Sequence, residues 1–239
     1  MWNMPDCVHA KRLDEYVDAI ARNAQILQKV LCTLRGIGPQ GTWLGSRKLG
    51  PGTPEYTWVT SVARIFAGIG IAAKTGGGPG LMEAPHYGCH LAKAPDRAVA
   101  MVGGFIGTED INPYVQDRGW VFTMPDFNTR HDGLLLGSLF HVVLWGRLGT
   151  VHEEADLLNR LKHGLLAKAP VYFVERNGYW SAKKSFMTDH VTEDLGPRIS
   201  PEDYEHTKIV DLFETSPVAF ARMVLEEIGF QHARVCEVN

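Results

Sequence analysis

The first strong pattern along the chain is an amphipathic stretch near the N-terminus. Over residues 10–34, apolar side chains recur every three or four positions with polar residues between them, which predicts a helix. The apolar positions are Leu13, Val17, Ile20, Ala24, Leu27 and Leu31. This stripe either packs against its own domain or forms a seam between subunits, and we favour the first interpretation.

From residue 42 onward, short apolar runs alternate with amphipathic segments. The runs predict strands at 42–46, 71–76, 98–104, 119–124, 141–145 and 170–174. The segments predict helices at 54–68 and 150–163, within 79–93 and 126–138, and, after one more short strand, from about Ser216. Parallel strands need crossover connections, which are usually helices. The pattern therefore predicts an α/β fold: a doubly wound, Rossmann-like, mostly parallel sheet with helices on both faces.

We expect two parts, an N-terminal amphipathic helix with a linker (1–41) and a Rossmann-like domain (42–239). The junction "GIGPQG", residues 36–41, satisfies G-x-G-x-x-G literally. A dinucleotide-binding loop follows a strand and opens a helix, whereas this stretch follows a helix and opens a strand. We therefore interpret it as a linker.

Composition and charge narrow the classes of function. The chain has 239 residues, 45% hydrophobic and 21% charged, with a net charge of -3, so it lacks the basic surface of a nucleic-acid-binding protein. No apolar run is long enough to cross a membrane, and the N-terminus lacks the apolar core of a signal peptide. The four cysteines form no C-x-x-C pair, which favours reduced thiols in a cytoplasmic protein.

A glycine-rich turn follows the predicted strand 71–76. In "GGGPG" (Gly76, Gly77, Gly78, Pro79 and Gly80), every residue is glycine or proline, and a helix follows. Glycines let backbone N–H groups approach an anion closely, and a helix N-terminus adds unsatisfied donors. We favour a phosphate site here over a tight turn without a ligand. It is not a Walker loop, because the Lys-Ser/Thr ending is missing.

A second turn, "WGRLGTVHEE" at 145–154, follows the predicted strand 141–145. Thr150 and Glu153 have the spacing of a capping box, which by itself would explain both residues. A ligand site is the alternative. The stretch lacks the second histidine of a zinc protease helix, since Asp156 stands in its place, so we expect no metal site.

Arg130 and His131 lie where a further helix begins. Together, "TGGGPGLMEAP", "MPDFNTR" and "GRLGTVHEE" resemble the Lonely Guy family, often mislabelled lysine decarboxylases, in order and approximate spacing. They look closest to its nucleotide 5'-monophosphate nucleosidase branch. Supporting matches are "GSR" at Gly45 to Arg47, "NPY" from Asn112 and "NGYW" from Asn177. The resemblance covers about residues 42–230.

The resemblance implies hydrolysis of the N-glycosidic bond of a nucleoside 5'-monophosphate, giving free base and ribose 5-phosphate. It implies that Glu153 and Arg130 are catalytic, that Glu83 reaches the ribose, and that no metal or other cofactor is needed. A fixed carboxylate suits this chemistry, because departure of the base leaves positive charge on the sugar. The implied substrate- and phosphate-binding residues are Gly45, Ser46, Gly76, Gly77, Gly78, Gly80, Gly146, Arg147, Gly149 and Thr150. The resemblance also implies a homodimer or larger assembly.

One departure leaves alternatives open. The family's Pro-Gly-Gly is replaced by Trp145-Gly146-Arg147, so an arginine occupies a glycine position in the phosphate-binding turn. Arg147 would either crowd the phosphate or add a charged contact to it. The chain is then a hydrolase or a catalytically silent nucleotide sensor. A cytokinin-activating enzyme is a further alternative, mildly disfavoured because His131 replaces the lysine common in plant-type members.

Overall fold

A computed structural model describes residues 8–104, 111–189 and 204–230. Its centre is a seven-stranded sheet in the order β4-β3-β2-β1-β5-β6-β7, and every neighbouring pair is parallel. The strands are β1 (Gln40–Leu44), β2 (Ala72–Thr75), β3 (Ala98–Gly103), β4 (Trp120–Met124), β5 (Phe140–Val143), β6 (Val171–Glu175) and β7 (Thr207–Asp211). The predicted parallel sheet is confirmed.

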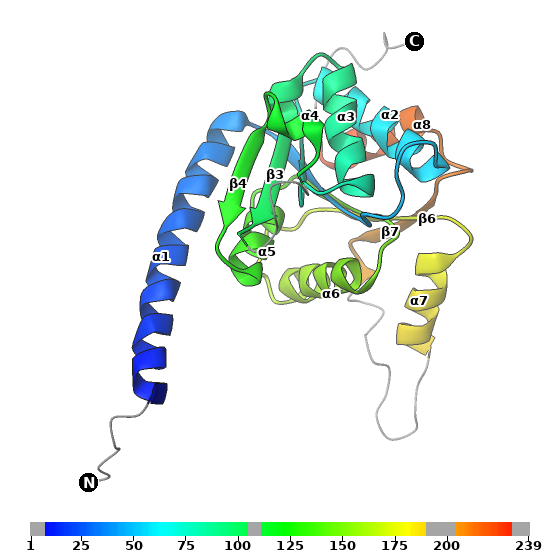
Figure 1. The fold of residues 1–239 in the computed structure, drawn as a ribbon. Helices are drawn as coiled ribbons and strands as arrows, with labels where there is room; N and C mark the ends of the chain where they lie inside the picture. Colours follow the sequence, from blue (N-terminus) through cyan, green and yellow to red (C-terminus); the bar gives the residue numbers. More distant parts are fainter. Residues whose placement is uncertain (1–7, 105–110, 190–203, 231–239) are drawn as a thin grey trace.

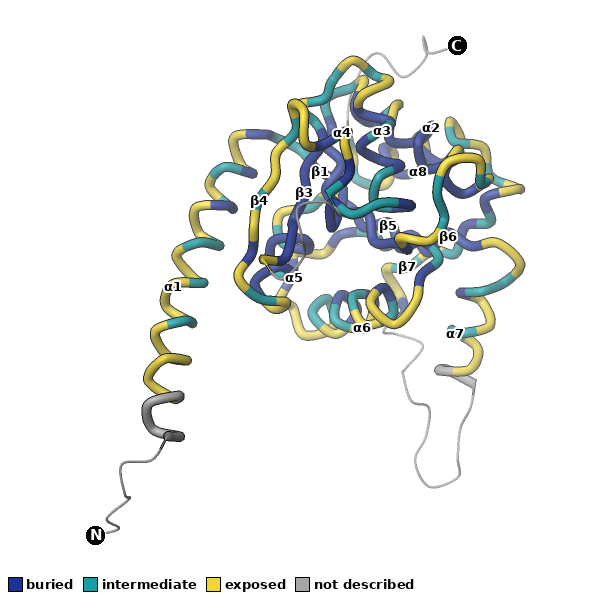
Figure 2. Tube along the Cα trace, viewed as in Figure 1, coloured by how far each residue is buried: buried dark blue, intermediate teal, exposed yellow. Residues whose placement is uncertain are grey.

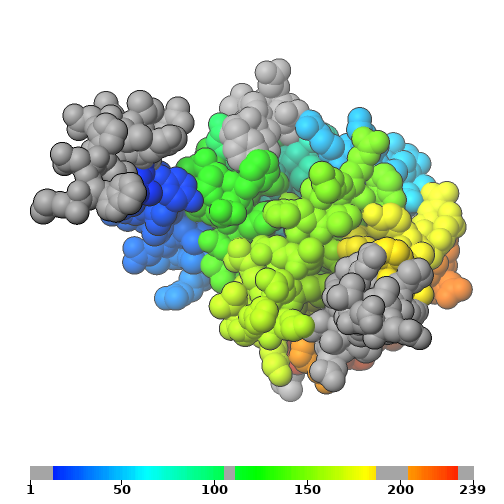
Figure 3. All heavy atoms as spheres, turned by 90° about the horizontal axis from the view of Figure 1, so that it is seen from below, coloured from blue at the N-terminus to red at the C-terminus, as the bar shows by residue number. Residues whose placement is uncertain are grey.

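Helices cover both faces of this sheet (Figure 1). One face carries α2 (Pro54–Gly68), the short helix η1 (Gly80–Met82), α3 (Glu83–Leu91), α4 (Pro113–Gln116) and α8 (Pro217–Glu227). The other carries α1 (Val8–Ile37), α5 (Phe127–Leu135), α6 (Leu148–Lys162) and α7 (Tyr179–Asp189). Figure 3 shows α6 across the middle of this second face, with α7 beside it and α1 at the edge. The doubly wound α/β fold is therefore confirmed.

Helix α1 is longer than predicted and has two different halves. Near its C-terminal end, Val30, Leu34 and Ile37 are buried in the core of the second face. The N-terminal half projects from the body, and Val17 and Ile20 are 56% and 53% exposed (Figures 1 and 2). The apolar stripe thus packs on the domain only in part.

The linker assigned to 36–41 is mostly wrong. Gly36 lies inside α1, and Gly41 lies inside β1, where a Cβ atom would meet the Phe140 ring at 2.2 Å. Only Gly38 and Pro39 connect helix to strand. The residues of this G-x-G-x-x-G match therefore serve packing and chain reversal.

Helix α7 was absent from the sequence prediction. Its start is fixed by Glu175 at the end of β6, whose carboxylate accepts hydrogen bonds from the backbone N–H groups of Trp180 (2.7 Å) and Ser181 (2.8 Å). Trp180 then packs into the core against Phe173.

None of the helices within the described ranges has the length and apolar character of a membrane-spanning segment.

Candidate functional site

The candidate site lies where the strand order reverses. β1 is followed in space by β2 on one side and by β5 on the other, so the connections that leave these strands diverge. In open parallel sheets, ligands bind at such a point, outside the carboxyl ends of the strands. The turns after β1, β2 and β5 contain most of the residues that the sequence analysis selected.

Arg130 and Glu153 meet at this edge. Arg130 Nη1 lies 3.7 Å from Glu153 Oε1, and its Nε donates a hydrogen bond of 2.8 Å to the backbone oxygen of Met101. Both side chains are largely buried. Burial raises the pKa of Glu153, while electrostatic interactions with Arg130 and His152 oppose that shift. The pair is 23 positions apart in sequence and comes from α5 and α6.

The pair faces a cleft of about 280 Å³. The cleft is lined by Gly45, Ser46, Arg47, Lys48, Met82, Arg130, Arg147, Gly149, Thr150 and Glu153. Four of these side chains are cationic and one is a carboxylate, in a chain whose net charge is negative. A hollow of about 120 Å³ against Gly76 to Pro79 shares Arg47, Met82 and Arg130 with it. The two spaces together favour an anionic ligand larger than a bare phosphate.

The N-terminus of α6 opens on the cleft. The helix has 15 residues, begins at Leu148, and no side chain caps it. Its first backbone N–H groups therefore remain as donors for an anion, and the helix dipole adds to their effect. Thr150 is the third helical residue and not the cap, so the capping-box interpretation of Thr150 and Glu153 is wrong. Glu153 instead turns toward Arg130.

Arg147 occupies its turn without strain. Its φ of -96° and ψ of -160° are extended backbone that any residue adopts, and its side chain is exposed at the cleft. The backbone at this position therefore does not require a glycine. Gly146 is the constrained position, because a Cβ atom there would lie 2.1 Å from Thr150 Oγ1.

The glycine-rich turn is held closely by its neighbours. A Cβ atom at Gly76 would lie 2.2 Å from Arg130 Nη2, so the guanidinium rests directly against this glycine. Gly77 has a φ of +78°, which side-chain-bearing residues rarely adopt. Asn112 braces the turn by donating hydrogen bonds to the backbone oxygens of Gly77 (2.8 Å) and Gly78 (3.2 Å).

Three predicted residues, Gly80, Glu83 and Gly146, line neither the cleft nor the hollow. Glu83 lines neither space, and its carboxylate accepts a hydrogen bond of 2.7 Å from the Tyr56 hydroxyl. Burial, followed by that bond to Glu83, raises the pKa of Tyr56. Gly80 packs against the backbone of Ser46 and Arg47, so it positions the turn after β1.

Sequence reasoning missed several residues of the cleft wall. Arg47, Lys48 and Met82 line it, and His131 lies behind Glu153, with Nε2 3.8 Å from Glu153 Oε1 and Nδ1 3.3 Å from Asp156 Oδ2. Burial lowers the pKa of His131. The "GSR" motif was the one available signal for Arg47, and the "TRH" triplet the signal for His131. Over the described residues, no group of three or more histidine, cysteine or acidic side chains is arranged to hold a metal ion.

No family model and no curated protein matches this chain, but solved structures do. A molybdenum cofactor binding protein from Rippkaea orientalis is 17% identical with a TM-score of 0.54, over 80% of this chain and 97% of that one. The structural genomics target TM1055 is 17% identical with a TM-score of 0.56, over 79% and 99%. The molybdenum cofactor carrier protein from Chlamydomonas reinhardtii is 16% identical with a TM-score of 0.51, over 80% and 97%. At these identities the likeness shows a shared fold.

Proposed function

We propose that this protein is a nucleoside 5'-monophosphate phosphoribohydrolase, which uses water to split a nucleotide into free base and ribose 5-phosphate. One observation carries the proposal. The largely buried carboxylate of Glu153 lies 3.7 Å from Arg130 in a cleft that is otherwise cationic and that contains an uncapped helix N-terminus. The resemblance of these motifs to the Lonely Guy family supports the same reaction.

The phosphate would bind at the start of α6. Backbone N–H groups from Leu148 to Thr150 supply donors, and the side chain of Arg147 supplies a charge-assisted contact. Arg47 and Lys48 also line the cleft and add positive charge. This arrangement leaves the ribose beside Arg130 and Glu153, in the direction of the glycine-rich turn.

Glu153 would act on the sugar. As the bond between C1' and the base nitrogen breaks, the base leaves with the electron pair and the ribose gains positive charge, which the carboxylate stabilises. Water supplies its hydroxyl to C1' and a proton, by way of Glu153, to the base. The raised pKa of Glu153 makes it a better proton acceptor, provided that it is ionised. Activity should therefore fall on the acid side at a higher pH than for an exposed glutamate.

Arg130 would hold the nucleotide in register. Its guanidinium is fixed by Met101 and by Gly76, and its planar donors match phosphate or ribose oxygens. Its charge also counters the tendency of the buried Glu153 to take up a proton.

The direct test is release of ribose 5-phosphate from purine, pyrimidine and N6-prenylated nucleoside monophosphates. We expect Glu153→Gln and Arg130→Ala each to lower the rate by about 10²–10⁴ while leaving the fold intact. Glu226→Gln, at an exposed glutamate on α8, is the matched control. Wild-type rates in Glu153→Gln would contradict the proposed role. Preference for the prenylated substrate would favour the cytokinin-activating alternative.

A second candidate is nucleotide binding without hydrolysis. Arg147 at the mouth of the cleft, and the pairing of Glu153 with Arg130, suit a site that holds its ligand. Two of the similar structures are a molybdenum cofactor binding protein and a molybdenum cofactor carrier protein, so this fold also serves binding. Nucleotide binding in calorimetry, with no ribose 5-phosphate released from any substrate, would favour this candidate.

A further inference from the structure

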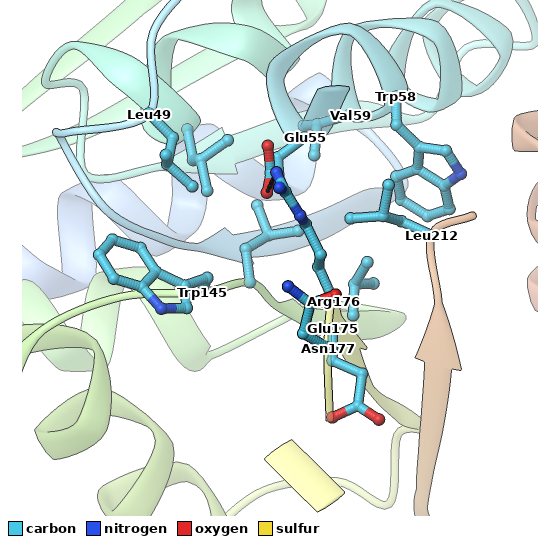
Figure 4. A pocket seen from close by; sticks show the side chains of 12 residues that line it. Leu49, Glu55, Trp58, Val59, Trp145, Glu175, Arg176, Asn177 and Leu212 are labelled. Carbon is cyan, nitrogen blue, oxygen red and sulfur yellow. Dashed lines mark hydrogen bonds and ion pairs between the residues drawn. The ribbon is translucent and has the colours of Figure 1, made fainter. Parts of the chain in front are cut away.

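A second pocket, of about 200 Å³, lies beside the cleft and shares no lining residue with it. It opens past the carboxyl ends of β5, β6 and β7, under the first turns of α2 (Figure 4). Most of its lining is apolar, including Leu49, Leu144 and Leu212, and two tryptophans contribute. Trp145 stands on one side, and Trp58 stands on the other (Figure 4).

A thin wall separates this pocket from the cleft. Lys48 lines the cleft and Leu49 the pocket; Arg147 lines the cleft and Trp145 the pocket. The backbone N–H of Ser46 donates to the oxygen of Trp145 (3.1 Å), which joins the two turns of the wall. The two departures from the Lonely Guy pattern, Trp145 and Arg147, therefore each line a different space.

The pocket contains a carboxylate with one unused oxygen. Glu55, on the first turn of α2, is 9% exposed, and its Oε1 accepts a hydrogen bond of 3.1 Å from Arg176 Nη1. Within the described part of the chain, its buried Oε2 has no hydrogen-bond partner. A buried hydrogen-bond acceptor without a partner costs free energy. A ligand that donates a hydrogen bond to Oε2 would therefore gain affinity for the pocket.

The Arg176 guanidinium, which pairs with Glu55, can change its position. Arg176 reaches toward Glu55 across the pocket (Figure 4), but its side chain is 43% exposed, and its guanidinium also lies 5.6 Å from the centre of the Phe213 ring. The Arg176 end of this ion pair is the exposed one, so its guanidinium can be solvated when it moves. Arg176 can therefore move toward Phe213 or contact the ligand itself, and Asn177 lies beside it on the lining.

We propose that this pocket binds a planar nitrogen heterocycle with an exocyclic amino group, of the size of a free nucleobase. The amino group would donate to Glu55 Oε2, and the ring would lie against the Trp145 indole with the apolar side chains around it. The volume is below the range of about 300–1,000 Å³ that is usual for drug-sized ligands, and it suits one small ring system. A saturated amine would use the carboxylate but not the flat aromatic wall.

The test is binding of free bases, which the proposed hydrolysis does not consume. Adenine and cytosine carry the amino group, and hypoxanthine and uracil are the matched bases without it. Calorimetry, with tryptophan fluorescence as a second signal, should show that the aminated bases bind at least tenfold more tightly. Glu55→Gln should weaken adenine binding at least tenfold, and Leu49→Trp, which fills the pocket, should abolish it.

Controls separate this pocket from the cleft. Glu226→Gln should bind adenine like the wild type, and circular dichroism should show that Glu55→Gln is folded. Adenine binding that survives Glu55→Gln and Leu49→Trp but is lost in Arg130→Ala belongs to the cleft and overturns the proposal. Absence of adenine binding up to 1 mM also overturns the proposal. So does binding of hypoxanthine or cyclohexylamine with the same affinity as adenine. Because nucleotide hydrolysis is assayed separately, failure of one proposal leaves the other standing.

Discussion

Gly76→Ala tests whether the fixed position of Arg130 matters. Gly76 has no positive φ, so its backbone accepts alanine, but the new Cβ would lie 2.2 Å from Arg130 Nη2 and 2.9 Å from Met82 Sδ. Ordinary contacts begin near 3.4 Å. The guanidinium must therefore retreat by about 1 Å, while its Nε remains tied to Met101. Displacement of a positioning group by about 1 Å can lower a rate by about 10².

We therefore expect Gly76→Ala to lower kcat/KM for the nucleotide about 100-fold, which is about 2.7 kcal/mol of transition-state stabilisation. The crowding should also cost about 1–3 kcal/mol of folding stability. The measurements are steady-state release of ribose 5-phosphate and urea unfolding. Gly68→Ala is the matched control, because a Cβ atom there meets nothing within 4 Å and its φ is not positive. It should keep the wild-type rate.

Comparison with Arg130→Ala decides the interpretation. If Arg130→Ala is inactive while Gly76→Ala turns over at the wild-type rate, the arginine is needed but its contact with Gly76 is not. That result would refute the argument from rigid placement. If both variants are fully active, Arg130 is not part of the reaction.

Three further predictions follow from charge and exposure. Arg147→Gly should raise KM about tenfold with little change in kcat, since it removes one charged phosphate contact; a higher kcat would mean that the arginine restrains turnover. Lys74, buried in β2, has its pKa lowered by burial to about 7, so the unfolded chain binds more protons above that pH. Stability should rise by up to about 1.4 kcal/mol per pH unit between pH 7 and 8.5 in urea unfolding, and Lys74→Met should flatten this slope. We also propose that the protein is a homodimer or a larger assembly, with the exposed half of α1 as the interface. Light scattering should report a smaller mass for the double variant Val17→Lys, Ile20→Lys than for the wild type. An unchanged mass would exclude that interface.

The sheet was predictable from sequence because its strands are nearly continuous apolar runs. β3 and β5 are buried at every position, as strands covered on both faces must be. Helix α7 was not, because its start depends on Glu175, whose role as a cap requires the chain to reverse at Asn177 and Gly178 with positive φ. A helix fixed mainly by such a local reversal leaves a weak periodic pattern.

The candidate site was predictable only as separate motifs. Glu153 and Arg130 were selected by resemblance, and their distance of 3.7 Å is a product of how α5 and α6 cross the same sheet edge. The start of α6 was misjudged because Thr150 and Glu153 imitate a cap by spacing alone. The pocket around Glu55 left no motif, since its walls come from five connections spread from Leu49 to Leu212.

The strand order also has a consequence for how the molecule is made. One edge of the central strand β1 pairs with β2, which lies about 30 residues after β1 in the chain. The other edge pairs with β5, which lies about 100 residues after β1. Contacts this distant in sequence slow folding, and an unpaired strand edge invites association with other chains. During synthesis, the part of the chain that precedes β5 therefore exposes one unpaired edge of β1. The cleft forms only when that edge has paired with β5 and α6 has followed, so ligand binding requires the chain as far as Glu153.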